Sequence, residues 1–144
     1  MSVVGVGPSN ARIALVGEAP GDIEMREGAP FVGPAVKLLD GLLEESGIRR
    51  QYIYITNILQ EQPNPDGRSS TARNDFGVLY EDAGRKQASS RLLTAVERLC
   101  LELHRVQPHV VVALGNDALR WLTGKQGISD WRGSVIPGVG SIVK

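Results

Sequence analysis

The sequence predicts an α/β fold, a three-layer α/β/α sandwich around a central, mostly parallel sheet of four strands. Apolar runs of strand length alternate along the chain with segments of helical periodicity, which is the order of a parallel sheet with crossover helices. The strand-like runs are apolar at consecutive positions, as in strands that are covered on both faces. A chain of 144 residues can bury a core of its own, so residues 1–144 are expected to form one domain.

The first half of the chain predicts two strands and one helix. Residues 12–17, RIALVG, predict a buried strand that ends at Gly17. A helix is expected from Pro34, which suits a first turn, to Gly47, which suits a C-terminal cap. Residues 52–57, YIYITN, are β-branched and aromatic and predict the second strand.

The second half of the chain predicts two helices, a third strand and a short fourth one. Residues 89–106 carry the clearest helical stripe of apolar side chains. HVVVALG (109–115) predicts the third strand, and a short helix follows, capped by Asn116 and closed by Gly124. The tail GSVIPGVGSIVK (133–144) offers one or two further short strands.

Residues 60–88 form a long polar segment rich in Pro, Gly, Ser and Asn, which indicates a loop or insertion. Loops of this length within compact domains often carry function. The segment contains the letters DFG, but a protein kinase is excluded. No Gly-rich nucleotide loop, strand lysine or catalytic-loop motif accompanies those letters.

Composition bounds the kind of function. The 16 Lys and Arg residues balance the 16 Asp and Glu residues, so any contact with DNA must come from a local basic surface or from backbone amides. The single cysteine excludes a disulfide framework and sites that need several thiolates. No signal peptide or membrane span is recognisable, so the expectation is a soluble intracellular protein without a membrane partner.

The stretch GEAPGDIEMREGAPFVG (17–33) follows the first predicted strand. Ligands of parallel sheets bind beyond the carboxyl ends of the strands. This stretch should therefore share one rim with residues 57–65, which begin with Asn57, and with residues 115–116. It is neither a Walker loop nor a dinucleotide fingerprint, because Gly-Lys-Ser/Thr and G-x-G-x-x-G are both absent.

Three acidic side chains of this stretch leave two interpretations open. Asp22, Glu24 and Glu27 could form a metal site or a solvated loop surface. Clustered acidic loop residues are more often solvated, so no metal is expected.

Several pieces of the sequence, in order, resemble uracil-DNA glycosylases of family 4. LVGEAPGDIEMREGAPFVGPA matches their first motif, which runs GEAPG, two residues, a glutamate, a short gap and G-x-PFVG. GIRRQYIYITNI is similar to the strand and Thr-Asn that follow. RVQPHVVVALGNDALRWLTG and WRG (131–133) are similar to the third strand, the next helix and an Arg-Gly element. The resemblance runs from Arg12 over nearly the whole chain, and the inserted NDFGVLYEDA looks like phage-encoded members.

The resemblance implies hydrolysis of the N-glycosidic bond of deoxyuridine in DNA. Its implied partners are uracil-containing DNA and replication proteins such as a DNA polymerase. Its implied location is the cytoplasm of a bacterial cell or of a phage-infected host. A glycosylase extrudes the base and holds it in a pocket, where Phe31 would stack on it. The amide of Asn57 would read the pyrimidine edge, since it both donates and accepts hydrogen bonds.

The first motif also supplies the expected catalytic groups, Glu18 and Glu24. A carboxylate can orient water or stabilise the positive charge that develops on the sugar. Backbone amides from Ala19 to Asp22 could bind a phosphate or the uracil carbonyls. The complete set of expected substrate-binding residues is Gly17, Ala19, Gly21, Asp22, Phe31 and Asn57.

The sequence departs from the family pattern in its cysteines. Family 4 enzymes usually hold an iron–sulfur cluster on four cysteines. Here Cys100 stands at one expected ligand position, Glu61 stands at another, and the N-terminal pair is absent. No cluster and no other cofactor are therefore expected, and Cys100 is expected to be a small buried hydrophobic residue.

A second departure is that the family's closing His-Pro motif is absent before the chain stops at GVGSIVK. The domain is therefore expected to be incomplete at its C-terminus. Three explanations stay open: a fragment, a protein that binds without cutting, or a sheet edge that a partner covers. The alternative function is a non-catalytic module of the same fold that binds DNA, nucleotides or protein.

Overall fold

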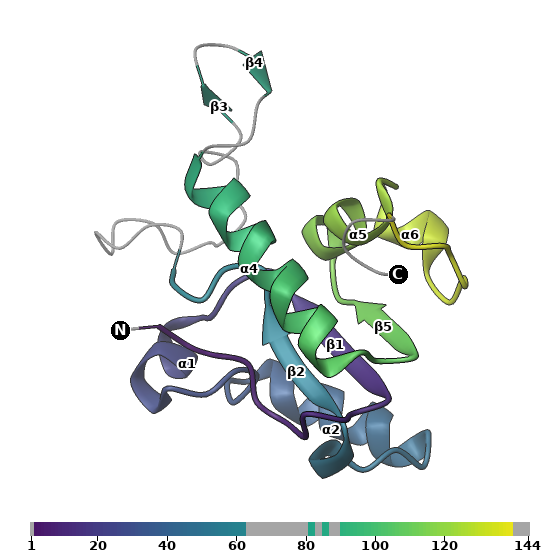
Figure 1. Ribbon diagram of the computed structural model, residues 1–144. Coiled ribbons are helices and arrows are strands. Elements are labelled where there is room, and N and C mark those ends of the chain that lie inside the picture. The colour runs from purple at the N-terminus through teal and green to yellow at the C-terminus, as the bar shows by residue number, and fades with distance from the viewer. Residues whose placement is uncertain (1, 63–80, 83–84, 87–89, 140–144) are drawn as a thin grey trace.

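The computed structural model describes residues 2–62, 81–82, 85–86 and 90–139 (Figure 1). The main sheet contains three parallel strands in the order β2-β1-β5. A second sheet is an antiparallel pair, β3-β4. The strands are β1 (Ile13–Gly17), β2 (Tyr54–Asn57), β3 (Glu81–Asp82), β4 (Arg85–Lys86) and β5 (Val110–Ala113).

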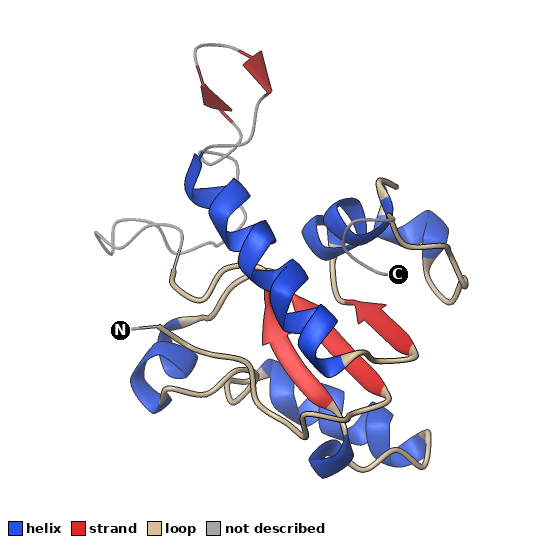
Figure 2. Cartoon of the chain, in the orientation of Figure 1, coloured by secondary structure: helices blue, strands red, loops and turns tan. Residues whose placement is uncertain are grey.

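Helices cover both faces of the main sheet, which confirms the layered α/β architecture (Figure 2). The two longest are α2 and α4, and they pack on opposite faces. The helices are α1 (Asp22–Glu27), α2 (Ala35–Glu45), the 3-10 helix η1 (Arg50–Tyr52), α4 (Ser90–Val106), α5 (Asn116–Thr123) and α6 (Ile128–Trp131).

Alternation along the strands divides the core into two clusters. On β1, Ala14 and Val16 face the α4 side, where they join the apolar stripe of α4. Leu15 faces the α2 side and packs in one cluster with Leu43 and Ile55. Successive side chains of a strand point to opposite faces, so a strand that is apolar at every position fits a sheet covered on both sides.

The expected fourth strand is not found among the described residues. Residues 134–139 form no strand, and residues 140–144 lie outside the described part. Pro137 cannot donate to a strand ladder and Gly138 weakens a strand, which accounts for the irregular backbone. Most of the expected loop or insertion at 60–88 also lies outside the described residues, which include only 60–62, 81–82 and 85–86 of it.

Two local predictions need correction. Residues 22–27 form the helix α1 rather than a loop. Asn116 is the first residue of α5 and Gly115 is its cap, so the Asn116 side chain instead accepts a hydrogen bond from the Ile128 amide, 2.8 Å away. Gly124 closes α5 in the left-handed conformation, as predicted.

The two edges of the main sheet differ. Val6 forms an antiparallel bridge with Ile55, so the N-terminal segment covers the β2 edge. Within the described residues no strand pairs with the other edge, β5, whose Val110 is 54% exposed. None of the described helices combines the length and the hydropathy needed to cross a membrane.

Candidate functional site

Three of the predicted residues meet at the carboxyl edge of the sheet. Gly17 ends β1 and pairs in register with Asn57, which ends β2. A Cβ atom added to Gly17 would lie 2.5 Å from Asn57 Oδ1 and 2.5 Å from Phe31 Cζ. The amide and the aromatic ring therefore converge directly on the Gly17 backbone, and only glycine leaves room for both.

Asn57 is hydrogen-bonded to a side chain of α4. Its side chain is buried, and its backbone carbonyl accepts a hydrogen bond of 2.6 Å from Arg98 Nη2. The same Arg98 nitrogen also donates to the carbonyl of Ile58 at 2.6 Å. Arg98 is in turn ion-paired with Glu102, one turn along α4, and Glu102 accepts a 2.6 Å hydrogen bond from the Tyr54 hydroxyl.

The pKa values of two members of this network are shifted. Burial, together with the hydrogen bond to Glu102, raises the pKa of Tyr54 to about 12. Burial lowers the pKa of Arg98, and the charge of Glu102 opposes that shift. The Tyr54 phenol donates its proton to the Glu102 carboxylate and keeps that proton to a higher pH than a solvated tyrosine does.

Phe31 stands in an uncommon backbone conformation. Its φ of 54° lies in the left-handed region, which bulky residues rarely adopt. Its ring packs on the α2-side cluster. Arg50 Nη2 donates to the carbonyls of Pro30 (3.2 Å) and Phe31 (2.6 Å), while Arg50 Nη1 is paired with Asp40 at 3.0 Å.

Glu24 ties down the other side of the same turn. Its Oε1 accepts hydrogen bonds from the amides of Val32 (3.1 Å) and Gly33 (2.7 Å). Its Oε2 accepts one from the Gly21 amide at 3.2 Å. A Cβ at Gly21 or Gly33 would come within 3 Å of these oxygens, so both glycines permit the close approach.

The remaining predicted residues lie along the start of the loop. Glu18 is half-buried, its Oε1 is shielded from solvent, and its backbone carbonyl accepts from the Leu59 amide at 3.0 Å. Ala19 packs against the α4-side core. Asp22 is exposed and accepts a 2.6 Å hydrogen bond from Gln62 Nε2.

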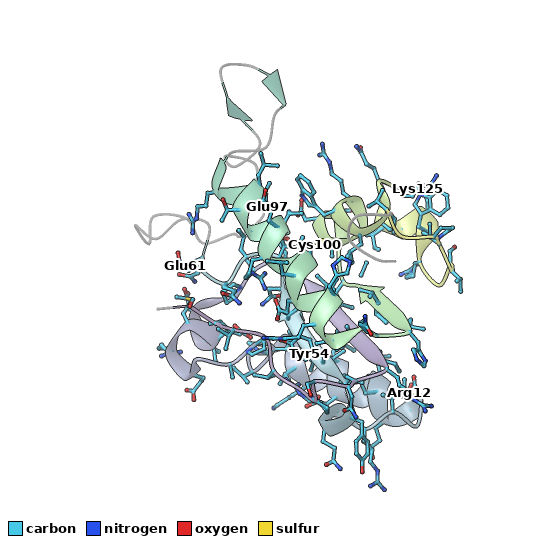
Figure 3. All side chains as sticks on the ribbon, viewed as in Figure 1. Arg12, Tyr54, Glu61, Glu97, Cys100 and Lys125 are labelled. Atoms are coloured by element: carbon cyan, nitrogen blue, oxygen red, sulfur yellow. The ribbon has the colours of Figure 1, made fainter. Side chains whose placement is uncertain are left out.

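The chain's donors do not fit an iron–sulfur cluster. Glu61 is paired with Arg91 near the start of α4, whereas Cys100 lies nine residues further along that helix, a rise of about 13 Å (Figure 3). Cys100 Sγ instead approaches His104 Nδ1 at 3.6 Å. One thiol cannot replace four, and the described residues contain no group of three or more side chains placed to hold a metal.

Arg50 and Arg98 were not predicted from the sequence. Arg50 stands beside Arg49, and nothing in the local sequence shows which of the two donates to backbone carbonyls and which is solvated. Arg98 and Glu102 are spaced as an ordinary surface pair of a helix. One feature of the sequence could have indicated that this pair is not on the surface. Glu102 follows Leu99 by three positions and therefore borders the buried apolar stripe of the helix.

The model of the uracil-DNA glycosylase superfamily matches residues 4–142. The chain therefore belongs to this superfamily. Two relatives of type 4 confirm the resemblance to family 4. It is 37% identical to the type-4 uracil-DNA glycosylase of Thermotoga maritima over 140 residues, 96% of this chain and 64% of that protein. The type-4 enzyme of Archaeoglobus fulgidus is 38% identical over 120 residues, 83% of this chain and 51% of that protein.

A further relative is a DNA polymerase of Bacillus phage SP01. It is 28% identical over 132 residues, which are 91% of this chain and 12% of the polymerase. The chain thus spans between about half and two thirds of the two type-4 enzymes, and a small part of the polymerase.

Proposed function

We propose that this protein binds uracil-containing DNA and hydrolyses the N-glycosidic bond of deoxyuridine. The observation that most directly supports this proposal is that the Phe31 ring and the Asn57 amide converge on Gly17. They do so at the carboxyl ends of the strands, where ligands of such folds bind. An extruded base needs an aromatic face and a partner for its polar edge. The names of the type-4 relatives support the same substrate.

In the proposed reaction the bond between C1′ and N1 breaks, and its electron pair leaves with the uracil. Water adds hydroxide to C1′, and its proton goes to the departing base. Phe31 stacks on the base, and Asn57 donates to and accepts from its edge. Glu18, which follows Gly17 directly, orients the water or stabilises the charge on the sugar.

We assign Glu24 a different role from Glu18. Both of its carboxylate oxygens accept backbone amides, so it acts as a positioning residue for the loop. The Gly21 amide donates to Glu24, and this leaves the neighbouring amides of the loop for a phosphate or a uracil carbonyl. We place the protein in the cytoplasm, where it would meet DNA.

The second candidate is a module that binds DNA without cleaving it, in contact with replication proteins such as a DNA polymerase. One observation favours it: neither histidine of the chain lies at the site. His104 is exposed on α4. His109 precedes β5 and so lies at the amino ends of the strands, whereas the site lies at their carboxyl ends. The likeness to a stretch of a phage DNA polymerase supports the replication partner.

In the deciding experiment, the 144-residue chain is incubated with uracil-containing oligonucleotides. The protein is purified from a host without its own uracil-DNA glycosylase. Single- and double-stranded substrates are compared with thymine controls, and alkaline cleavage reveals abasic sites. We expect strand breaks at uracil alone, and at least a 100-fold loss in Phe31→Ala and in Asn57→Ala.

The outcomes separate the two candidates. No product at high protein concentration, with DNA binding retained in fluorescence anisotropy, refutes the glycosylase and supports the binding module. Product that persists in the Phe31→Ala/Asn57→Ala double variant refutes the assigned pocket.

A further inference from the structure

We propose that Arg50 is a positioning residue that holds the Phe31 ring in place for the extruded base. This inference rests on the proposed function, because the ring matters only if a base stacks on it. Arg50 reaches the loop from η1 and has no place in the family motif that includes Phe31.

The argument begins with the strain at Phe31. An aromatic residue at φ of 54° is held away from the conformations that it prefers. Such a residue keeps its conformation only when its surroundings fix it. The ring points to Gly17 in this conformation, so a relaxed backbone would aim the ring elsewhere.

Arg50 and Glu24 fix this turn from opposite sides. Glu24 accepts the two amides that follow Phe31, whereas Arg50 donates to the two carbonyls up to and including it. The 2.6 Å bond to the Phe31 carbonyl is charge-assisted and therefore among the stronger ones. Asp40 on α2 pairs with the other guanidinium nitrogen and keeps the fork oriented.

A planar guanidinium suits this task better than an ammonium group. One nitrogen serves both carbonyls and the other serves Asp40, so a single side chain links the loop to α2. The neighbouring Arg49 offers a matched control. It is exposed, and its side chain makes no hydrogen bond or ion pair within the described part of the chain.

The first test is a double-mutant cycle on uracil release. Arg50→Met should lower kcat/KM about 10- to 100-fold, whereas Arg49→Met should leave it unchanged. In a Phe31→Ala background, Arg50→Met should cost less than about threefold, because the ring through which it acts is already missing. An equal cost in both backgrounds would overturn the inference.

The second test does not depend on activity. The chain has two phenylalanines, so 4-fluorophenylalanine gives two ¹⁹F signals, and Phe76→Leu identifies that of Phe31. Arg50→Met should shift or broaden the Phe31 signal and Arg49→Met should not. An unchanged signal overturns the inference even in an active enzyme. If the Phe31 signal changes but the chain releases no uracil, the positioning role of Arg50 is supported and only the proposed glycosylase activity is refuted.

If Arg50→Met fails to fold, Arg50→Lys takes its place. Lysine keeps the charge beside Asp40 but cannot reproduce the fork, so the Phe31 signal should still change. Thermal unfolding of both variants checks that the fold is intact. An Arg50→Lys protein with unchanged signal and activity would refute the need for the guanidinium.

Discussion

Gly17 is the residue on which the site depends most directly. It ends a buried strand, and its missing side chain is replaced by the Phe31 ring and the Asn57 amide of two other segments. The function of this glycine is therefore the space above its Cα atom rather than freedom of its backbone.

We expect Gly17→Ala to disturb the site more than the fold. The added methyl group must displace the ring or the amide, which should cost roughly 1–3 kcal/mol of stability and most of the uracil release. Urea unfolding and the oligonucleotide assay measure the two effects.

Gly41→Ala is the matched control. Gly41 lies inside α2, and a Cβ there meets nothing within 4 Å, so alanine should add about 0.5–1 kcal/mol and leave activity unchanged. Equal behaviour of the two variants would contradict the packing argument.

At the scale of elements, the contact between α4 and β2 combines apolar packing with one polar chain. Tyr54 from β2 and Arg98 from α4 meet at Glu102, and Arg98 continues to the carbonyl of Asn57. The orientation of the site thus depends on how α4 is seated on the sheet.

The raised pKa of Tyr54 predicts a loss of stability in alkali. The folded state holds the phenol proton up to about pH 12, whereas the unfolded chain releases it near pH 10. The resulting stabilisation is complete below pH 10 and is lost as the pH rises toward 12. Urea unfolding between pH 8 and 12 should show this fall.

Tyr54→Phe should be less stable at pH 8, since Glu102 loses a donor, and the gap to the native protein should narrow above pH 10. Tyr52→Phe is the control at pH 8, because Tyr52 is 60% exposed and its substitution removes only a surface hydroxyl. A gap of constant width across the range would contradict the shifted pKa.

The sequence predicted the elements of the main sheet well, and the reasons are visible in particular residues. Continuous apolar strands and the stripe of α4 report burial directly, and the strand ends placed Gly17 and Asn57 on one rim. The fold of the loop itself was not predictable. Helix α1 buries no residue, and what stabilises it is the bond pattern of Glu24, which has no periodic signature.

The contacts through which Arg50 and Arg98 support the site escaped prediction for a related reason. Each acts on backbone carbonyls of a segment at least 19 positions away. Such contacts depend on the assembled tertiary structure, whereas propensity and spacing report only neighbours along the chain.

At the scale of the whole molecule, the described residues protect the two edges of the main sheet unequally. The N-terminal segment covers β2, whereas β5 presents Val110 and Val112 with 54% and 36% exposure. Unpaired strand edges with apolar side chains favour association with other chains.

We expect the 144-residue chain to self-associate through β5 as its concentration rises. Val110→Lys should weaken this association at least several-fold in sedimentation velocity, because an edge lysine opposes strand pairing. Val4→Lys is the control, since Val4 is similarly exposed, at 52%, but lies on the covered side. An equal effect of both variants, or a native chain that stays monomeric, would contradict the role of β5.

The Glu24 carboxylate accepts the amide of Gly21 and those of Val32 and Gly33, so the loop is held on both sides of the turn that follows α1. Gly28, which closes α1, is exposed, and a Cβ atom there would meet nothing within 4 Å. We expect a foreign peptide inserted at Gly28 to be displayed beside the candidate site while Glu24 and Phe31 keep their places. The loop thus offers a natural grafting site, where new recognition can be added without rebuilding the chemistry next to it.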